Sequence, residues 1–198
     1  MTEKEEKKKE PVAAAEEEPQ VIEMKGGDYQ IHIFLERGKN FKGDDAVESI
    51  DAMFQIETCG LTVYSKVEKG CPLRNEKGTH FGEHIFIEPH GLSHEYMKSA
   101  NLEIKLMNKG VFRDEMIASF EIDIPKAYAM SDDHAIHNRW LAMNDPNSVN
   151  YQEIKAYIKC SISIKGPGDN AVKLQEDAVG IHDHLPALMP ASIAKTYK

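Results

Sequence analysis

The clearest hydrophobic pattern of the chain lies in residues 154–164. Every even-numbered position there is apolar or small, and every odd-numbered position is Lys, Tyr or Ser. A repeat of two residues over this length predicts a long β-strand with one buried face and one exposed face. The sequence Gly166-Pro167-Gly168-Asp169 follows at once and ends the predicted strand, because glycine and proline interrupt strands.

Shorter alternations of the same kind recur along the middle of the chain. Together they predict strands at 29–36, 52–57, 61–65, 83–87, 102–106, 116–124, 140–143 and 154–164. Gly60 predicts a hairpin between the second and third of these strands. Short helical excursions are expected after Ser93 and at 125–130. About eight short strands separated by turns predict an all-β fold, an antiparallel eight-stranded β-sandwich.

The segments outside these strands differ in composition from the middle of the chain. Residues 1–26 are rich in charge and low in complexity at their start, which predicts a disordered arm. Residues 27–170 form the predicted domain. Residues 171–198 carry two prolines and scattered apolar positions, which favours a disordered tail, with a docking peptide as the alternative.

Composition narrows the classes of function. The chain has 198 residues and a formal net charge of −9, which argues against general nucleic-acid binding. Its apolar runs are far shorter than the roughly 20 residues that cross a bilayer, so no transmembrane segment is predicted. Its three cysteines are far apart in the sequence, which favours reduced thiols in the cytoplasm over disulfides or a zinc site.

Several short motifs resemble those of C2 domains. Residues 49–56 (SIDAMFQI) resemble the S-x-D-P-Y-x-x-V signature, and residues 82–88 (GEHIFIE) are similar to W-N-E-x-F-x-F. Residues 114–118 (DEMIA) resemble the N-D-x-I-G strand entry. The order of 140–146 (WLAMNDP), a strand, and 166–169 (GPGD) resembles the second C2 domain of the ferlin family.

The resemblance covers residues 29–170 and implies a C2-type sandwich that contacts membranes or proteins. Ferlins carry many C2 domains and a C-terminal membrane anchor, whereas this chain is expected to hold one such domain and no anchor. The resemblance therefore implies a binding surface, and it does not imply fusion activity.

The resemblance also implies where calcium would bind, because C2 domains of the sensor type hold the ion with aspartates from two loops. Asp51 and either Asp44 or Asp45 match the first loop, and Glu115 lies near the last ligand position. The third loop, where an Asp-x-Asp is expected, instead reads Met-Asn-Lys at 107–109. A hard cation needs six to eight oxygen ligands, and a lysine repels it. We therefore expect a degenerate site, no cofactor and calcium independence.

Two groups of residues are candidates for lipid binding. The first is basic and lies around the third and fourth predicted strands: Lys66, Lys69, Arg74 and Lys77. Each such residue contributes about 1 kcal/mol near an anionic membrane; a solvated edge is the alternative interpretation, since Glu68 and Glu76 interrupt the group. The second is a predicted loop tip with apolar and basic members: Lys109, Val111, Phe112 and Arg113.

No catalytic residues are predicted. The H-x-x-E-H pattern at 80–84 needs a helix to bring its histidines together, and Gly82 and the following residues predict a strand. The favoured hypothesis is a calcium-independent C2 adaptor that binds protein partners through the sandwich surface and both tails. The alternative is a peripheral module that binds anionic phospholipid in membrane trafficking. Either would act in the cytoplasm, free or associated with membrane or cytoskeletal structures.

Overall fold

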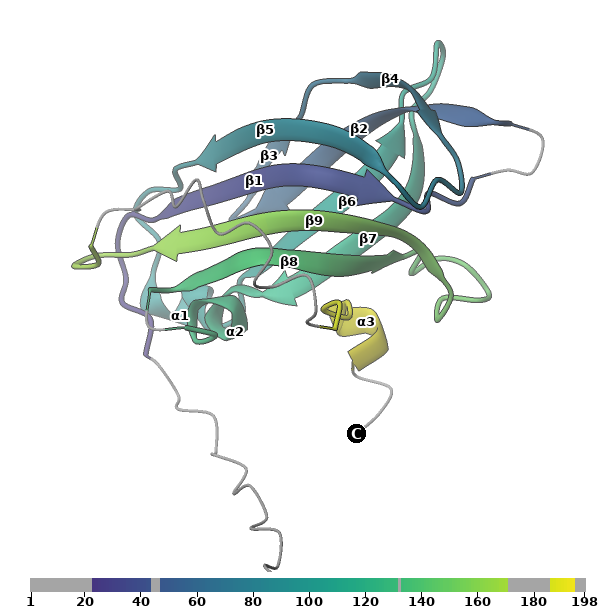
Figure 1. The fold of residues 1–198 in the computed structure, drawn as a ribbon. Coiled ribbons are helices and arrows are strands. Elements are labelled where there is room, and N and C mark those ends of the chain that lie inside the picture. Colours follow the sequence, from purple (N-terminus) through teal and green to yellow (C-terminus); the bar gives the residue numbers. More distant parts are fainter. Residues whose placement is uncertain (1–22, 44–46, 132, 171–185, 195–198) are drawn as a thin grey trace, which may run out of the picture.

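Two antiparallel layers face each other in the computed structural model, which describes residues 23–43, 47–131, 133–170 and 186–194 (Figure 1). The strands are β1 (Gln30–Lys39), β2 (Ser49–Thr58), β3 (Leu61–Tyr64), β4 (Glu68–Pro72), β5 (Thr79–Ile87), β6 (Asn101–Asn108), β7 (Glu115–Asp123), β8 (Ala135–Asn144) and β9 (Ile154–Lys165). Strand order is β3-β2-β6-β7-β8-β9-β1-β5. The two layers are β3-β2-β6-β7 and β8-β9-β1-β5, and a single residue pair, Ser119 with Asn144, joins them. The predicted antiparallel sandwich is confirmed.

The core lies between the layers and is built from the alternating positions that the sequence indicated. In β9, the even-numbered side chains from Ala156 to Ile164 are at most 1% exposed. In β1, the neighbour of β9, Ile31, Ile33 and Leu35 are fully buried, and Leu35 pairs with Cys160. The period-two pattern therefore predicted both the strands and their buried faces.

The hairpin between β2 and β3 is confirmed. Thr58 pairs with Leu61, so its loop consists of Cys59 and Gly60 alone. Both loop residues have positive φ, 48° and 75°. Two successive left-handed residues match the right-handed twist of the flanking strands, which is the geometry of a type I′ turn.

The strand β4 is a correction to the sequence analysis, which predicted no strand between residues 65 and 83. β4 pairs antiparallel with β2, outside the main path of eight strands. Cys71 is its one buried residue, so the sequence carries no alternation there. Backbone pairing with β2, rather than burial of side chains, makes this segment a strand.

Strands β5 and β8 begin well before their predicted starts. β5 begins at Thr79, although Gly82 within it has a φ of +59°. β8 begins at Ala135, five residues before the predicted start, and its pairing with β9 shifts between Ile136 and Arg139. This irregularity interrupts the alternation of apolar and polar residues, so only the second half of β8 was recognisable.

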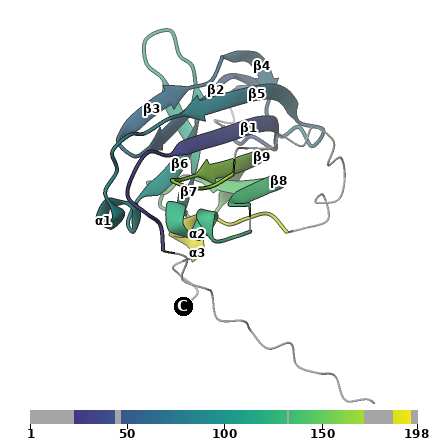
Figure 2. The ribbon, with the colours of Figure 1, turned by 90° about the vertical axis from the view of Figure 1, so that its left-hand side faces the viewer.

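Three short helices accompany the sheets, and none in the described part of the chain is long and apolar enough to cross a membrane. They are α1 (His94–Met97), α2 (Ile124–Tyr128) and α3 (Ala191–Ala194). The helical turn predicted after Ser93 is α1, and the Ser93 hydroxyl accepts a hydrogen bond from the Tyr96 amide. The second excursion, predicted at 125–130, is α2. Figure 2 looks onto the end of the sandwich where α1 and α2 lie.

The packed part of the chain includes residues on both sides of 27–170. Met24 precedes the predicted domain and is 3% exposed. Near the C-terminus, residues 186–194 lie against β7 and β8, and Ile193 of α3 is 3% exposed. Residues 1–22 of the predicted arm, and residues 171–185 and 195–198 of the predicted tail, lie outside the described residues.

Candidate functional site: the loop end of the sandwich

Four connections meet at one end of the sandwich, opposite α1 and α2; we call this the loop end. Strand register places them there. The end of β6 lies beside the start of β2, because Asn108 pairs with Ala52, and the start of β9 lies beside the end of β1. The four connections are residues 40–48, 73–78, 109–114 and 145–153, of which 44–46 are outside the described residues.

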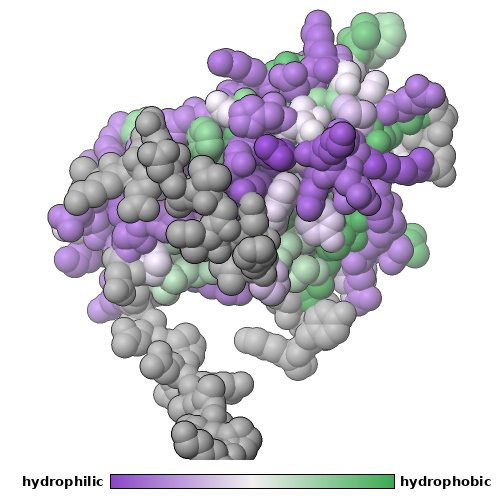
Figure 3. All heavy atoms as spheres, viewed as in Figure 1, coloured by the Kyte–Doolittle hydropathy of each residue, from purple (hydrophilic) through white to green (hydrophobic). Residues whose placement is uncertain are grey.

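Among the described residues of the loop end, three apolar side chains are almost completely exposed. Val111 and Phe112 in the β6–β7 loop are 94% and 101% exposed, and Val149 in the β8–β9 loop is 104% exposed. Figure 3 shows apolar atoms protruding at both loops, on the right-hand side of the view. Scattered exposed apolar residues are ordinary, but nearly complete exposure at the tips of two loops at the same end of the sandwich indicates a contact surface.

The β6–β7 loop is held in shape by its own ends. The Lys109 ammonium lies 2.8 Å from the Asp114 carboxylate, which also accepts a 3.3 Å hydrogen bond from the Gly110 amide. The hydrogen bond from Lys109 holds the pKa of Asp114 below its usual value. A Cβ on Gly110 would lie 2.0 Å from the Arg113 carbonyl oxygen, so the turn requires glycine there. The tip residues are therefore presented by a closed loop.

The β8–β9 loop is tied to its surroundings by a buried amide and by ion pairs. Asn144 donates a 2.5 Å hydrogen bond to the Tyr151 carbonyl oxygen. Glu153 lies 2.9 Å from Lys155 and 3.0 Å from Lys42 of the β1–β2 loop. Hydrogen bonds from these two lysines lower the pKa of Glu153. The cations of this region are thus largely engaged within the protein.

Of the residues predicted for a degenerate calcium site, the structure describes Asp51 and Glu115. The Asp51 carboxylate accepts a 2.9 Å hydrogen bond from the Gly70 amide and supports β4. Glu115 opens β7 opposite Asn108. Asp44 and Asp45 lie outside the described residues. Within the described ranges, no three His, Cys, Asp or Glu side chains gather in a way that could hold a metal ion.

The predicted basic group is divided between two places. Lys66 lies between β3 and β4, and Lys69 lies in β4. Arg74 and Lys77 lie in the β4–β5 loop, at the loop end. Lys66, Lys69 and Lys77 are exposed, and no described carboxylate lies within ion-pair distance of their ammonium groups. The Lys66 amide does donate to Glu83, so a carboxylate borders this group.

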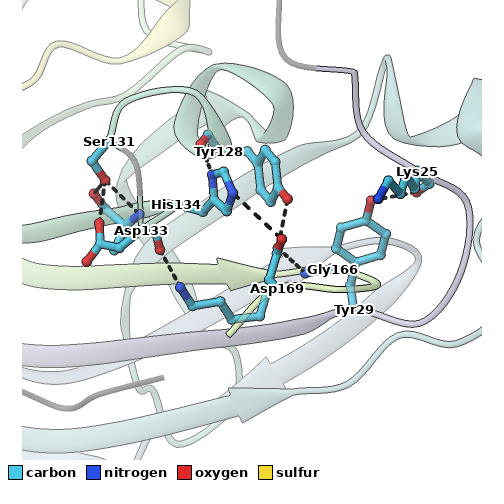
Figure 4. A network of polar contacts seen from close by, with 10 residues as sticks. Lys25, Tyr29, Tyr128, Ser131, Asp133, His134, Gly166 and Asp169 are labelled. Carbon is cyan, nitrogen blue, oxygen red and sulfur yellow. Dashed lines mark hydrogen bonds and ion pairs between the residues drawn. The ribbon is translucent and has the colours of Figure 1, made fainter. Parts of the chain in front are cut away.

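The opposite end of the sandwich holds a polar network around Asp169, the last residue of the GPGD motif (Figure 4). The Asp169 carboxylate accepts hydrogen bonds from the Tyr128 hydroxyl at 2.7 Å and the Gly166 amide at 2.8 Å. The His134 ring stacks on Tyr128 with centroids 3.6 Å apart, and its Nδ1 atom lies 2.8 Å from the Tyr128 carbonyl oxygen. The network joins the end of β9 to α2 and to the start of β8, which gives the motif a structural role.

Sequence reasoning missed Val149 and Asn144. Val149 is an isolated apolar residue in the stretch Asp-Pro-Asn-Ser-Val-Asn, which otherwise has the composition of an ordinary turn. A β-branched apolar residue is unusual in a turn, and this could have identified Val149 from the sequence. Asn144 ends a strand and gives no sequence signal for its buried contacts.

No protein-family model matches the sequence. Among solved structures, a chain of extended synaptotagmin 2 with an SMP domain and two C2 domains is similar, with a TM-score of 0.50 and 13% identity over 70% of this chain and 28% of that chain. A single C2 domain of a plant extended synaptotagmin 1 has a TM-score of 0.50 and 11% identity over 69% of this chain and 94% of that chain.

These similarities show the fold: the chain has the architecture of a C2 domain. It corresponds to little more than a quarter of the length of the extended synaptotagmin 2 chain. At identities this low, the comparison extends no further than the fold. The resemblance to the second ferlin C2 domain stays a prediction from the sequence motifs.

Proposed function

We propose that the protein is a non-catalytic, calcium-independent C2 module that attaches to membranes by inserting Val111, Phe112 and Val149 of the loop end. The observation that carries the proposal is the nearly complete exposure of these three side chains on two loops at the same end of the sandwich. In the β6–β7 loop, Lys109 and Arg113 flank the tip residues Val111 and Phe112. This places them at the level where a membrane presents its headgroups.

The magnitudes favour apolar insertion over electrostatic attraction. Burying a Val or Phe side chain contributes roughly 1.5–3 kcal/mol each, whereas a basic residue near an anionic surface contributes about 1 kcal/mol. Lys109 and Lys42 are already paired with Asp114 and Glu153. The formal net charge of −9 opposes anionic lipid further. We therefore expect binding to tolerate zwitterionic lipid and to depend weakly on salt.

Calcium independence is supported by the same loop. Lys109 places an ammonium group where the resemblance would require a carboxylate, and this ammonium group forms an ion pair with Asp114. Asp51 is engaged by the Gly70 amide. A calcium ion would have to break these contacts before it gained ligands.

Co-sedimentation with vesicles tests the proposal. The chain is mixed with phosphatidylcholine vesicles and with vesicles that also contain phosphatidylserine and a phosphoinositide, each with calcium or a chelator. We expect the wild-type chain to pellet with both kinds of vesicle, with or without calcium. We expect the pelleted fraction to fall strongly for Phe112→Asp. The matched control is Tyr64→Asp in β3, at a residue that is 55% exposed away from the loop end. Equal pelleting of Phe112→Asp and wild type would exclude insertion at this loop, and calcium-dependent pelleting would exclude calcium independence.

A second candidate is the adaptor function, a structural component of a larger protein assembly. The observation that favours it is that β8 already takes residues 186–193 as an added segment. A chain that stays in the supernatant with every vesicle composition would favour this function. Removal of residues 1–26 and 171–198 should then abolish its association with protein partners in a pull-down; full recovery would exclude docking by the tails.

A further inference from the structure

Strand β7 pairs with little of the edge of β8 that faces it. β7 pairs with β8 through Ser119 and Asn144 only. Beside Leu141, the place of a neighbouring strand is taken by residues 186–193 of the same chain, which we call the C-terminal segment. Leu188 forms a parallel bridge with Leu141. The segment therefore sits in a seam between the two layers.

Backbone contacts in the seam follow a parallel ladder that stops after one residue. The Ala142 amide donates to the Leu188 carbonyl oxygen, and the Leu188 amide donates to the Trp140 carbonyl oxygen, both at 2.8 Å. Continuing the ladder would require the amides two residues before and two residues after Leu188. Those residues are Pro186 and Pro190, which have no N–H group. The segment is thus limited to a single step of pairing.

Side chains give the seam its selectivity. Ile193 is 3% exposed, and Leu188 packs against the core. Asn144 is fully buried, and its Oδ1 atom accepts a 3.2 Å hydrogen bond from the Ser192 hydroxyl. A segment that left the buried Asn144 side-chain oxygen without a hydrogen-bond donor would be bound less stably. The seam therefore favours a segment with a hydroxyl at the position of Ser192. Arg139 donates to the Pro186 carbonyl oxygen at 2.8 Å.

We propose that the seam is a peptide-binding site for an extended segment of a partner protein, and that the chain's own C-terminal segment is its resident competitor. The partner segment has an apolar residue at the position of Leu188, a hydroxyl at that of Ser192 and an apolar residue at that of Ile193. It has an N–H group where this chain has Pro190. This type of recognition adds a strand to an exposed sheet edge, with the backbone giving affinity and the side chains giving specificity.

The two prolines explain why a partner would displace the resident segment. A tethered segment competes at an effective concentration on the order of millimolar. A second copy of this chain would bring the same prolines and gain no further hydrogen bonds. A partner segment with an N–H group at the position of Pro190 can continue the ladder toward the end of β8. The open edge therefore fits a foreign strand better than a copy of the resident one.

Peptide binding to the full chain tests the proposal, with fluorescence of Trp140, the one tryptophan of the sequence, as the readout. The probes are a labelled peptide of residues 184–194 with valine in place of both prolines, and the same peptide with the native sequence. The valine peptide should bind severalfold more tightly, because a further backbone hydrogen bond at the position of Pro190 strengthens binding by about that factor. Replacing its serine by alanine should weaken binding severalfold.

The full-chain variant Leu188→Pro removes the remaining ladder amide of the resident segment and should bind the valine peptide more tightly than wild type. Hydrogen exchange at the Ala142 amide should slow when the peptide binds. The absence of binding to both proteins up to about 1 mM peptide, with the variant's near-UV spectrum unchanged, would overturn the proposal. So would equal binding to both proteins with no change at Ala142. The test uses no vesicles, so its failure leaves the loop-end proposal standing.

Discussion

The Lys109 ammonium lies 2.8 Å from the Asp114 carboxylate, across the loop that carries Val111 and Phe112. The pair joins the two ends of the loop, so that the residues between them are held outward. It also removes one cation and one carboxylate from any further role. The resemblance to C2 domains implies calcium ligands on this loop, and the loop is closed here by an ion pair within the protein.

Calcium should therefore leave the thermal stability of the chain unchanged. A ligand at 100 times its dissociation constant raises the free energy of unfolding by about 2.7 kcal/mol, which a small domain shows as a clear rise in Tm. We expect the Tm to be the same with calcium and with a chelator. The measurement is differential scanning fluorimetry on Trp140.

Lys109→Asp is the matched variant, since it supplies a carboxylate where the resemblance requires one. A rise of Tm with calcium in this variant alone would show that Lys109 closes the site. A rise in the wild-type chain would contradict calcium independence.

The fold was predictable where burial alternates along a strand. The apolar positions of β1 and β9 reported their buried faces directly, because each faces the core on one side only. β4 was not predictable, since it is stabilised by pairing with β2 and buries Cys71 alone. A strand held by its backbone leaves no pattern in side-chain hydrophobicity.

The candidate site was predictable in part for a related reason. Val111 and Phe112 follow a lysine and a glycine at a loop tip, which is a local signal. Asn144 bonds to Ser192, a residue 48 positions away, and no local pattern reports such a contact. The seam beside β8 was missed for the same reason: it depends on how a distant segment returns to the sheet.

The chain should lose stability in alkali through Tyr128. Burial and the hydrogen bond to Asp169 raise the pKa of Tyr128 above its ordinary value of 10. Below pH 10 the hydroxyl is protonated in both states, so stability does not depend on it. Above pH 10 the unfolded state loses its proton first, and the free energy of unfolding falls by up to about 1.4 kcal/mol per pH unit for this group.

Urea unfolding between pH 8 and about 11 measures this slope. Tyr128→Phe should lower stability near neutrality by about 1–2 kcal/mol, through loss of the hydrogen bond to Asp169, and should also reduce the alkaline slope. Tyr29 and Cys160 have raised pKa values as well, so some slope should remain. An identical slope in wild type and Tyr128→Phe would contradict the assignment.

The three cysteines should react with thiol reagents only slowly in the folded chain. Cys71 and Cys160 are buried, and burial raises the pKa of all three thiols, including the partly exposed Cys59. The thiolate is the reactive form, so raised pKa values and burial both slow the reaction. Ellman's reagent should modify Cys59 first, and Cys160 only at the rate of global unfolding.

Cys59→Ser is the control for this labelling, because it should remove the first phase and leave the later ones. Urea should restore rapid reaction of all remaining thiols. Rapid reaction at Cys160 in the native chain would show that β9 opens locally.

Asn144→Leu should destabilise the chain and loosen two separate segments together. The Asn144 side chain donates to the Tyr151 carbonyl oxygen and accepts from the Ser192 hydroxyl, so it links the β8–β9 loop to the C-terminal segment. A leucine has similar volume but neither bond, and it leaves both partners unpaired. Each unpaired buried group costs about 1–3 kcal/mol of stability. Because water reaches Tyr151, we expect the total loss of stability to lie near the lower end of the sum of the two costs.

Hydrogen exchange distinguishes this link from general destabilisation. In Asn144→Leu, amides of residues 148–153 and the amide of Leu188 should both exchange faster, while those of β1 and β9 stay protected. Asn147→Leu is the matched control, since Asn147 lies exposed in the same loop. Faster exchange in the loop without any change at Leu188 would show that Ser192 does not depend on Asn144, and that the segment is held in the seam by Leu188 and Ile193 alone.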